Sequence, residues 1–308
     1  DEVRRKVRAA IKDSNYIPNN SARDLVRTKS ESIGLVVRGV SNPFYTDIIQ
    51  AIEKTVTDAG FSLVMQQIPS CGDEVQRAAI MEREKRLQGI IFLGGRLDYS
   101  PEDLAMLNVP YVCCSYSNQY GTLRIGEYSA VSIADEEAAQ QAVDHLYGHG
   151  HRRIAALICR PDDQSISQLR YQGYCKALSS HGIPLDPELV MCAGSFDIRD
   201  AYDAVCKKLR QGAEFTALFA IADSMAIGAM RALRDEGRAV PQDCSVIAID
   251  GLELSAYIEP PLTTLCQPME EMGQRSAQIL LGLIHGHGAH CCEVLPTQLR
   301  QGGSVQDI

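Results

Sequence analysis

IGLVVRGVSNPFYTDIIQAIEKTVTDAGFSLVM, residues 33–65, sets a pattern that the rest of the chain repeats. Its apolar runs at 33–37 and 61–65 have the length of buried strands. Between them, the apolar residues of 48–59 recur at helical spacing, and the pattern stops at Gly60, which suits a helix C-terminal cap. A strand, a helix and a strand in this order form the unit of a parallel sheet covered by helices.

The same alternation continues to the end of the chain. The residues predict further strands at 89–93, 110–114, 152–158, 189–192, 217–221 and 245–249, and helices at 73–87, 102–107, 135–147, 166–180, 198–210 and 223–235, followed by a last helix at 270–284 and a last strand at 293–299. A chain of 308 residues exceeds the usual size of one compact domain. We therefore predict an α/β protein with two similar doubly wound units in tandem.

The composition indicates a globular protein of a reducing compartment. Apolar residues make up 45% of the chain, yet no run is long enough to span a membrane, and no secretion signal is recognisable. Eleven cysteines are scattered without any Cys-x-x-Cys spacing, which favours reduced thiols. These features predict a cytoplasmic protein without a membrane partner.

The charge is distributed unevenly. The chain carries a net charge of −9, but residues 1–29 hold eight Lys or Arg against four acidic residues. This segment could be an arm that faces a polyanion, or simply a solvated helix face. The chain also starts at Asp1 within a helical pattern rather than at Met, so we expect that further sequence precedes it.

Motifs of common enzymes and phosphate sites are not found. The sequence contains no phosphate-binding loop, no dinucleotide fingerprint between a strand and a helix, and no nucleophile elbow. The cluster HGHGAHCC at 285–292 offers ligands that suit zinc, but its spacing matches no common zinc motif. We predict no metal, no cofactor and no enzymatic activity.

Ligands of open parallel sheets bind outside the carboxyl ends of the strands. The residues that follow the predicted strands are Asn42, Phe44, Tyr45, Asp135, Arg170, Phe196, Ala222, Asp223, Asp250 and Gln267. Carboxylates, a guanidinium, an amide and aromatic rings together suit a polyhydroxylated ligand.

Several of these residues also have ordinary structural roles. Asp135 and Asp223 begin helices and could be N-caps, a role that we favour for Asp223 and leave open for Asp135. Asp250 could cap a turn, and the aromatic side chains could belong to the core. Arg170 is harder to explain in this way, because a positive charge is disfavoured near the start of a helix. We therefore expect a partner anion or a ligand beside Arg170.

Six phrases in register resemble the lactose-repressor (LacI/GalR) family of bacterial transcription regulators. They are NYIPNNSARDL (15–25), SIGLVV with SNPFY (32–45), HGHRRIA (149–155), ADSMAIGAMRAL (222–233), VPQDCSVIAID (240–250) and PPLTTLCQP (260–268). The resemblance implies a helix-turn-helix headpiece, a hinge helix and a core like that of periplasmic sugar-binding proteins. Such a core has two subdomains that are each discontinuous in sequence.

The resemblance also implies boundaries. Residues 1–31 would comprise the third headpiece helix and the hinge helix, while the two other headpiece helices are not found. The N-terminal effector-binding subdomain would span 32–147 plus 269–293, and the C-terminal one 148–268 plus 294–308. Without a leucine heptad after residue 300, the expected assembly is a homodimer rather than a tetramer.

Carried over residue by residue, the family's effector contacts fall on Phe44, Tyr45, Asp135, Arg170, Phe196, Asp250 and Gln267. The hinge that contacts operator DNA falls on Ser21, Ala22, Arg23, Leu25 and Arg27, with Leu25 as an apolar wedge in the minor groove. One position departs from the pattern, because sugar-responsive members often have Asn where this chain has Ala222. The effector could therefore be unusual, make fewer hydroxyl contacts, or not be a simple sugar.

Together these features predict a dimeric repressor whose operator affinity is controlled by a small effector in a cleft between the subdomains. A mono- or disaccharide is the favoured effector, and a nucleobase or nucleoside is the alternative. A solute-binding protein for a sugar or nucleoside would have the same core but an export signal and no basic arm. An α/β enzyme would need a set of acid, base or nucleophile that we do not find.

Overall fold

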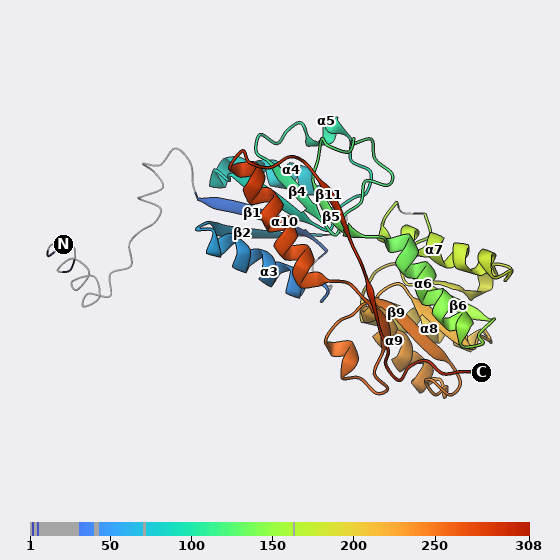
Figure 1. The fold of residues 1–308 in the computed structure, drawn as a ribbon. Helices are drawn as coiled ribbons and strands as arrows, with labels where there is room; N and C mark the ends of the chain where they lie inside the picture. Colours follow the sequence, from blue (N-terminus) through green and yellow to red (C-terminus); the bar gives the residue numbers. More distant parts are fainter. Residues whose placement is uncertain (1, 3–4, 6–30, 40–42, 70–71, 163) are drawn as a thin grey trace.

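The computed structural model describes residues 2, 5, 31–39, 43–69, 72–162 and 164–308. The predicted hinge residues 21–27 and the predicted third headpiece helix therefore lie outside the described residues, apart from the helical Glu2 and Arg5. So does Asn42. The described chain forms two lobes side by side, each built on one sheet (Figure 1).

The first lobe contains a six-stranded sheet in the order β11-β5-β4-β3-β1-β2, with every neighbouring pair parallel. Its strands are β1 (Ser32–Arg38), β2 (Ser62–Ile68), β3 (Gly89–Leu93), β4 (Tyr111–Cys114), β5 (Ala130–Ile133) and β11 (Cys292–Leu295). The central strand β3 is buried at all five positions, as expected of a parallel sheet covered on both faces.

The second lobe repeats this arrangement in the order β12-β10-β9-β8-β6-β7. Its strands are β6 (Ile154–Ile158), β7 (Val190–Cys192), β8 (Ala217–Ala220), β9 (Ser245–Asp250), β10 (Thr263–Cys266) and β12 (Gln298–Arg300). All pairs are parallel except β10 with β12. The prediction of an α/β fold with two doubly wound parallel sheets is confirmed, with an antiparallel strand at this one edge.

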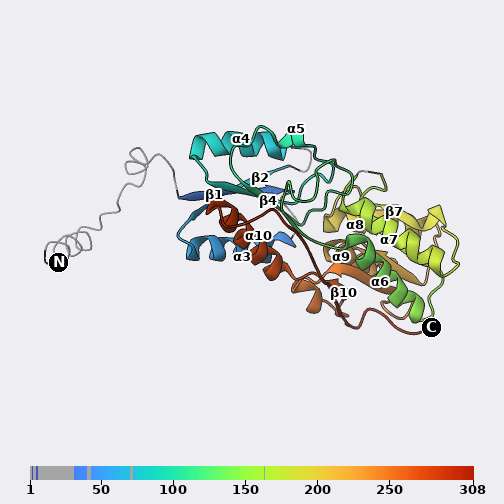
Figure 2. The same cartoon turned by 45° about the horizontal axis from the view of Figure 1, so that its top comes forward.

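Helices cover both faces of each sheet. Around the first sheet lie α3 (Tyr45–Asp58), α4 (Glu74–Lys85), the short α5 (Pro101–Leu104) and α10 (Met269–Ile284). Around the second lie α6 (Asp135–Gly148), α7 (Ile166–Ser180), α8 (Ile198–Arg210) and α9 (Asp223–Asp235), with 3-10 turns at Pro187–Leu189 and Leu254–Ala256. Helices α3 and α10 pack together on one face of the first sheet, and α4 lies on the opposite face (Figure 2).

The prediction of a single last strand at 293–299 is wrong. The segment contains two strands, and β11 pairs with β5 of the first sheet whereas β12 pairs with β10 of the second. The chain thus passes from one lobe to the other between Leu295 and Gln298, at Pro296 and Thr297. The two sheets are therefore not formed by consecutive halves of the chain, and the predicted boundary between 293 and 294 lies within β11.

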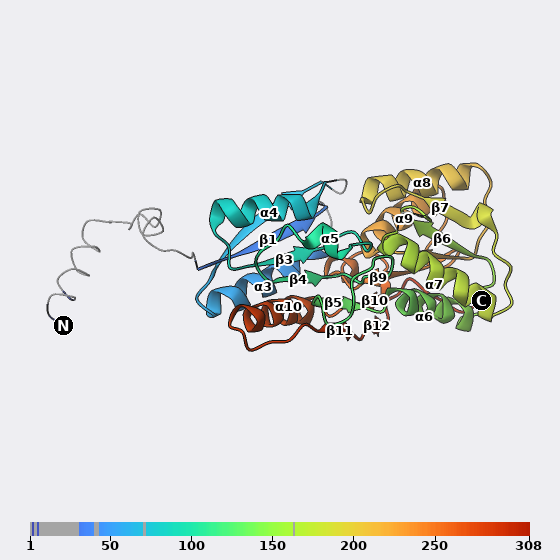
Figure 3. The same ribbon diagram turned by 90° about the horizontal axis from the view of Figure 1, so that it is seen from above.

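The predicted end of the first segment of the N-terminal subdomain, at residue 147, is also wrong. This boundary assigns helix α6 to the first lobe. Instead, α6 packs against α7 and against strands β8, β9 and β10 of the second sheet. Its buried face, which includes Ala138, Ala142 and Leu146, joins the core there. The chain thus crosses between the lobes at Ala134, directly after β5, and Figure 3 shows α6 beside α7 in the second lobe.

All ten cysteines in the described part of the chain are free. No helix in the described residues combines the length and the apolar composition that crossing a membrane requires.

Candidate functional site

Arg170 is the centre of a buried ionic cluster in the second lobe, next to the crossover from the first. Its Nε donates a hydrogen bond to Asp135 Oδ1 at 2.8 Å, and its Nη1 donates to Asp250 Oδ1 at 3.3 Å. Nη1 also donates to the carbonyl oxygen of Ile221 at 2.5 Å. These two carboxylates are the partner anions that the sequence led us to expect. Arg170 is only 3% exposed, and both carboxylates are buried as well. Three elements supply the three charges: the start of α6, the second turn of α7 and the end of β9.

Gln267 extends this cluster from the residue after β10. Its Nε2 donates to Asp250 Oδ1 at 2.8 Å, and its backbone N–H donates to the Asp250 carbonyl oxygen at 2.9 Å. The other carboxylate oxygen of Asp250, Oδ2, and the amide oxygen of Gln267, Oε1, are buried without a hydrogen-bond partner among the described residues. Buried acceptors without a donor are costly, so these two atoms indicate a place for a ligand that donates hydrogen bonds.

The backbone at Asp250 is strained. Its φ of +139° lies in a region that residues other than glycine rarely adopt. The next residue, Gly251, has a φ of +82°, and a Cβ there would lie 2.6 Å from Cys266 Cβ. This turn aims the carboxylate of Asp250 at Arg170 and Gln267 rather than along the strand. Strain of this kind is characteristic of positions that serve a site.

Burial dominates the electrostatics of the cluster. It raises the pKa of Asp250 to about 7, and the nearby charge of Asp223 adds to this rise, although Arg170 opposes it. Burial also raises the pKa of Asp135, again against the effect of Arg170. One guanidinium is thus shared by two carboxylates, of which Asp250 takes up a proton near neutral pH.

Tyr45 brings the first lobe to this cluster. It is the first residue of α3, and burial raises the pKa of its hydroxyl to about 12, with the charge of Asp250 as the next cause. Tyr45 therefore keeps its proton at neutral pH and can donate or accept a hydrogen bond. It lies close enough to Asp250 for the charge of that carboxylate to affect its pKa. Phe44, in contrast, is 3% exposed and lies in the hydrophobic core, with its ring centroid 5.6 Å from that of Tyr45.

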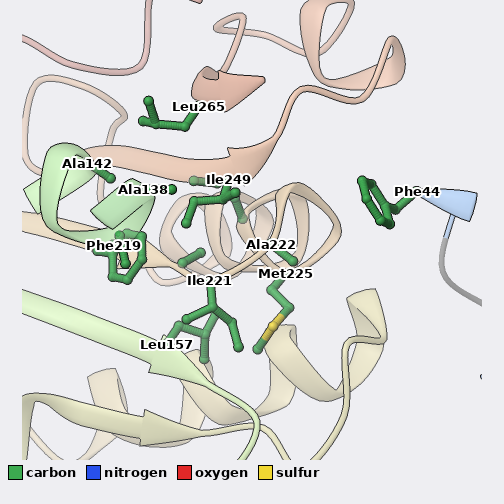
Figure 4. Packing of buried hydrophobic residues seen from close by; sticks show 14 of the residues in the cluster. Phe44, Ala138, Ala142, Leu157, Phe219, Ile221, Ala222, Met225, Ile249 and Leu265 are labelled. Carbon is green, nitrogen blue, oxygen red and sulfur yellow. The ribbon is translucent and has the colours of Figure 1, made fainter. Parts of the chain in front are cut away.

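The remaining predicted positions are apolar. Phe196 lies between β7 and α8, partly buried against the core, and its carbonyl oxygen accepts a hydrogen bond from Ser224 Oγ at 2.8 Å. Ala222 is fully buried, and Figure 4 shows it beside Met225 in the apolar cluster of the second lobe. It offers no polar side-chain atom to the Arg170 cluster.

The prediction that Asp223 caps α9 is wrong. The N-cap residue is Ala222, and no side chain caps this helix. The fully buried Asp223 Oδ2 instead accepts hydrogen bonds from Gly251 N, Leu252 N and Ser255 Oγ, while Oδ1 accepts from Thr264 Oγ1 at 2.5 Å. Asp223 therefore holds the loop that follows Asp250. For Asp135, where a cap was left open, the cap bond is likewise not made, and Arg170 is the partner.

A carboxylate that the sequence did not single out lies at the start of α4. Glu74 is 1% exposed and accepts hydrogen bonds at Oε1 from Arg96 N at 3.0 Å, Arg38 Nη1 at 3.3 Å and the hydroxyl of Tyr99. Arg38 ends β1, and the loop containing Arg96 and Tyr99 follows β3. Glu74 thus lies at the carboxyl edge of the first sheet, where ligands of such sheets bind.

Comparisons with known proteins agree with the geometry. Residues 143–305 match the family model described as periplasmic binding protein-like domain. The chain is 36% identical to the HTH-type transcriptional regulator MalR of Clostridium butyricum, over 99% of this chain and 91% of the relative. It is 30% identical to the HTH-type transcriptional repressor CytR of Escherichia coli K12, over 92% of this chain and 82% of the relative.

Solved structures show the same fold. The lac repressor dimer bound to operator and the anti-inducer ONPF has a TM-score of 0.83 and 28% identity, covering 98% of this chain and 90% of that one. A complex of the transcriptional regulator CelR with cellobiose has a TM-score of 0.78 and 30% identity, with the same coverage. These relatives are regulators rather than enzymes. The chain belongs to the lactose-repressor (LacI) family of transcriptional regulators.

Proposed function

We propose that this regulator is a repressor that binds a sugar at the Arg170 cluster, between subdomains built on the two sheets. The observation that carries the proposal is the pair of buried acceptors, Asp250 Oδ2 and Gln267 Oε1, which lack donors among the described residues. Sugar hydroxyls are donors of the right kind, and Tyr45 supplies an aromatic face from the first lobe.

The relatives support a sugar as the effector class. Their descriptions include a complex with cellobiose, the lac repressor bound to ONPG, and a ribose operon repressor of Haemophilus influenzae that is 29% identical to this chain. The effector contacts that we propose are Phe44, Tyr45, Asp135, Arg170, Phe196, Asp250 and Gln267. Phe44 and Phe196 would form apolar walls of the site.

The regulatory mechanism that we propose is a linkage between two binding equilibria. A sugar that contacts Tyr45 from the first lobe and Asp250 from the second favours one relative placement of the lobes. In a cytoplasmic homodimer, that placement would determine whether both hinge segments, at 21–27, can engage operator DNA. By linkage, sugar and DNA then change each other's affinity by the same factor, typically worth about 1–3 kcal/mol.

A thermal-shift screen tests the effector class. The panel contains ribose, glucose, maltose and cellobiose, each with its phosphate monoester, together with adenosine and cytidine. A sugar that binds only the folded protein is expected to raise the melting temperature in a concentration-dependent way. Shifts produced by nucleosides alone, or by no compound, would contradict the proposed sugar effector.

The hinge assignment has its own test in the intact protein with its headpiece. Leu25→Ala removes the proposed minor-groove wedge, so operator affinity is expected to fall at least tenfold, while sugar affinity stays within twofold. Electrophoretic mobility shift and calorimetry measure the two affinities. An operator affinity equal to that of the unchanged protein would show that Leu25 is not the wedge.

A further inference from the structure

Glu74 uses its two carboxylate oxygens in different ways. Its Oε1 accepts three hydrogen bonds, from Arg38, the backbone of Arg96 and the Tyr99 hydroxyl. Burial and the charge of Glu74 raise the pKa of Tyr99, so that its hydroxyl keeps the proton that it donates. One oxygen therefore holds the loop after β3, and this role requires only an acceptor.

The other oxygen, Glu74 Oε2, is buried and has no hydrogen-bond partner among the described residues. A buried carboxylate oxygen without a donor is unfavourable, and an acceptor role in loop positioning does not explain it. Asp250 Oδ2 and Gln267 Oε1 are in the same state. All three atoms are acceptors, and all three belong to residues at the carboxyl edges of the two sheets.

Two adjacent glycines relate Glu74 to the Arg170 cluster. A Cβ at Gly94 would lie 2.4 Å from the Tyr45 hydroxyl, and a Cβ at Gly95 would lie 3.5 Å from Glu74 Oε1. The Tyr45 hydroxyl thus packs against one glycine and Glu74 against the next. Tyr45 is also within the electrostatic range of both Asp250 and Arg38, the ion-pair partner of Glu74. Tyr45 is thus near both Asp250 and the residues that contact Glu74.

We propose that Glu74 is a third recognition carboxylate, which accepts a hydroxyl of the sugar from the side of the first lobe and makes the site selective for unphosphorylated sugars. This inference rests on the proposed function. A phosphate group brings only acceptors and negative charge at neutral pH, and it would meet Glu74 Oε2, Asp250 Oδ2 and Gln267 Oε1, which are acceptors as well. Such a pairing repels, whereas a neutral polyol supplies the missing donors.

Glu74→Gln separates the two roles of this residue. The glutamine carbonyl can still accept from Arg38, Arg96 and Tyr99, so the amide nitrogen must then occupy the position of Oε2. A donor would replace the acceptor that faces the sugar, while the loop contacts stay in place. Glu82→Gln is a matched control, because Glu82 is also buried on α4 but both of its oxygens accept from Asn108, at 3.1 and 3.3 Å.

The experiment uses isothermal titration of both variants and the unchanged chain with glucose, ribose, maltose, cellobiose and their phosphate monoesters. We expect Glu74→Gln to weaken binding of the preferred neutral sugar by about ten- to a hundredfold, as for a lost hydrogen bond to a charged group. Glu82→Gln should bind it normally, and the matching phosphate should bind at least tenfold more weakly than the neutral sugar. The melting temperature of the unliganded Glu74→Gln variant should be no lower than that of Glu82→Gln, whose new amide nitrogen must face a donor of Asn108.

Two results would overturn the inference while leaving a sugar effector in place. One is neutral-sugar binding that Glu74→Gln does not weaken, and the other is tighter binding of the phosphate monoester than of its parent sugar. If Glu74→Gln melts far below Glu82→Gln, Glu74→Asp decides, since it keeps the charge but withdraws the carboxylate by one methylene. Weaker sugar binding supports the proposal, and unchanged binding contradicts it. No binding of any sugar by the unchanged chain contradicts the proposed function itself.

Discussion

Replacing Arg170 by methionine is expected to reduce sugar binding below detection and to lower the free energy of unfolding by about 3–5 kcal/mol. Methionine fills much of the space of the arginine stem but leaves the carboxylates of Asp135 and Asp250 buried without their shared cation. The loss of one partner from a buried ion pair is costly mainly because of the charge that remains. Urea denaturation measures the stability, and the thermal-shift panel measures the binding.

Adding Asp250→Asn to the Arg170→Met variant provides the internal control. It removes one of the two carboxyl groups that lose their cation, together with the cost of keeping Asp250 protonated without Arg170, so the double variant is expected to regain part of the lost stability above pH 7 while sugar binding stays absent. Arg231→Met is the matched surface control, because Arg231 pairs with Asp235 in an exposed i,i+4 ion pair that solvent screens, so its loss should change stability little. Equal effects of the buried and exposed substitutions would contradict the proposed role of the Arg170 cluster.

Much of the fold and part of the site followed from local signals. The alternation of apolar strands with amphipathic helices predicted two doubly wound sheets, because burial on both faces makes parallel strands continuously apolar. Arg170 was correctly expected to need a partner anion, since its charge near the start of α7 was unfavourable without one. Asp135 and Asp250 provide that partner.

What the sequence could not show depends on contacts between distant residues. Asp223 has the position of an N-cap, yet its hydrogen bonds reach residues 28 to 41 positions away, and nothing local distinguishes these two roles. Glu74 lies in a polar helix pattern, and its partner Tyr99 comes from a different loop. The strands β11 and β12 have four and three residues, too few for a periodic pattern, so their division between the sheets was missed.

The unliganded protein is expected to lose stability as the pH rises from 5 to 7. The pKa of Asp250 is about 7 in the folded chain, against an ordinary value of 3.8, so between these values the folded state holds a proton that the unfolded state has released. Stability then falls by about 1.4 kcal/mol per pH unit, or about 2–3 kcal/mol over this window, and levels off above pH 7. Urea titrations at fixed pH values measure this slope.

A variant isolates the contribution of Asp250. Surface carboxylates such as Asp235 and Glu293, whose pKa is lowered by Arg231 and Arg275, titrate below this window. Burial lowers the pKa of His145 and His151 from 6.5, so these histidines oppose the slope within the window, and only the difference between the unchanged chain and the variant reports Asp250. Asp250→Asn should flatten most of the slope, although the raised pKa values of Asp135 and Asp223 leave a remainder of the same sign. A slope that is unchanged in Asp250→Asn would assign the effect elsewhere.

The same proton connects stability to sugar binding. A sugar hydroxyl that donates to Asp250 Oδ2 requires the ionised carboxylate, so binding must displace the proton held at pH 6. Affinity is therefore expected to rise about tenfold between pH 6 and pH 8, with up to one proton released per sugar bound at the lower pH. Calorimetry in two buffers of different ionisation enthalpy counts that proton. Affinity that is independent of pH would mean that the sugar does not contact Asp250, and Asp250→Asn, which should abolish the pH dependence, separates its proton from that of Asp135, whose pKa is also raised by burial.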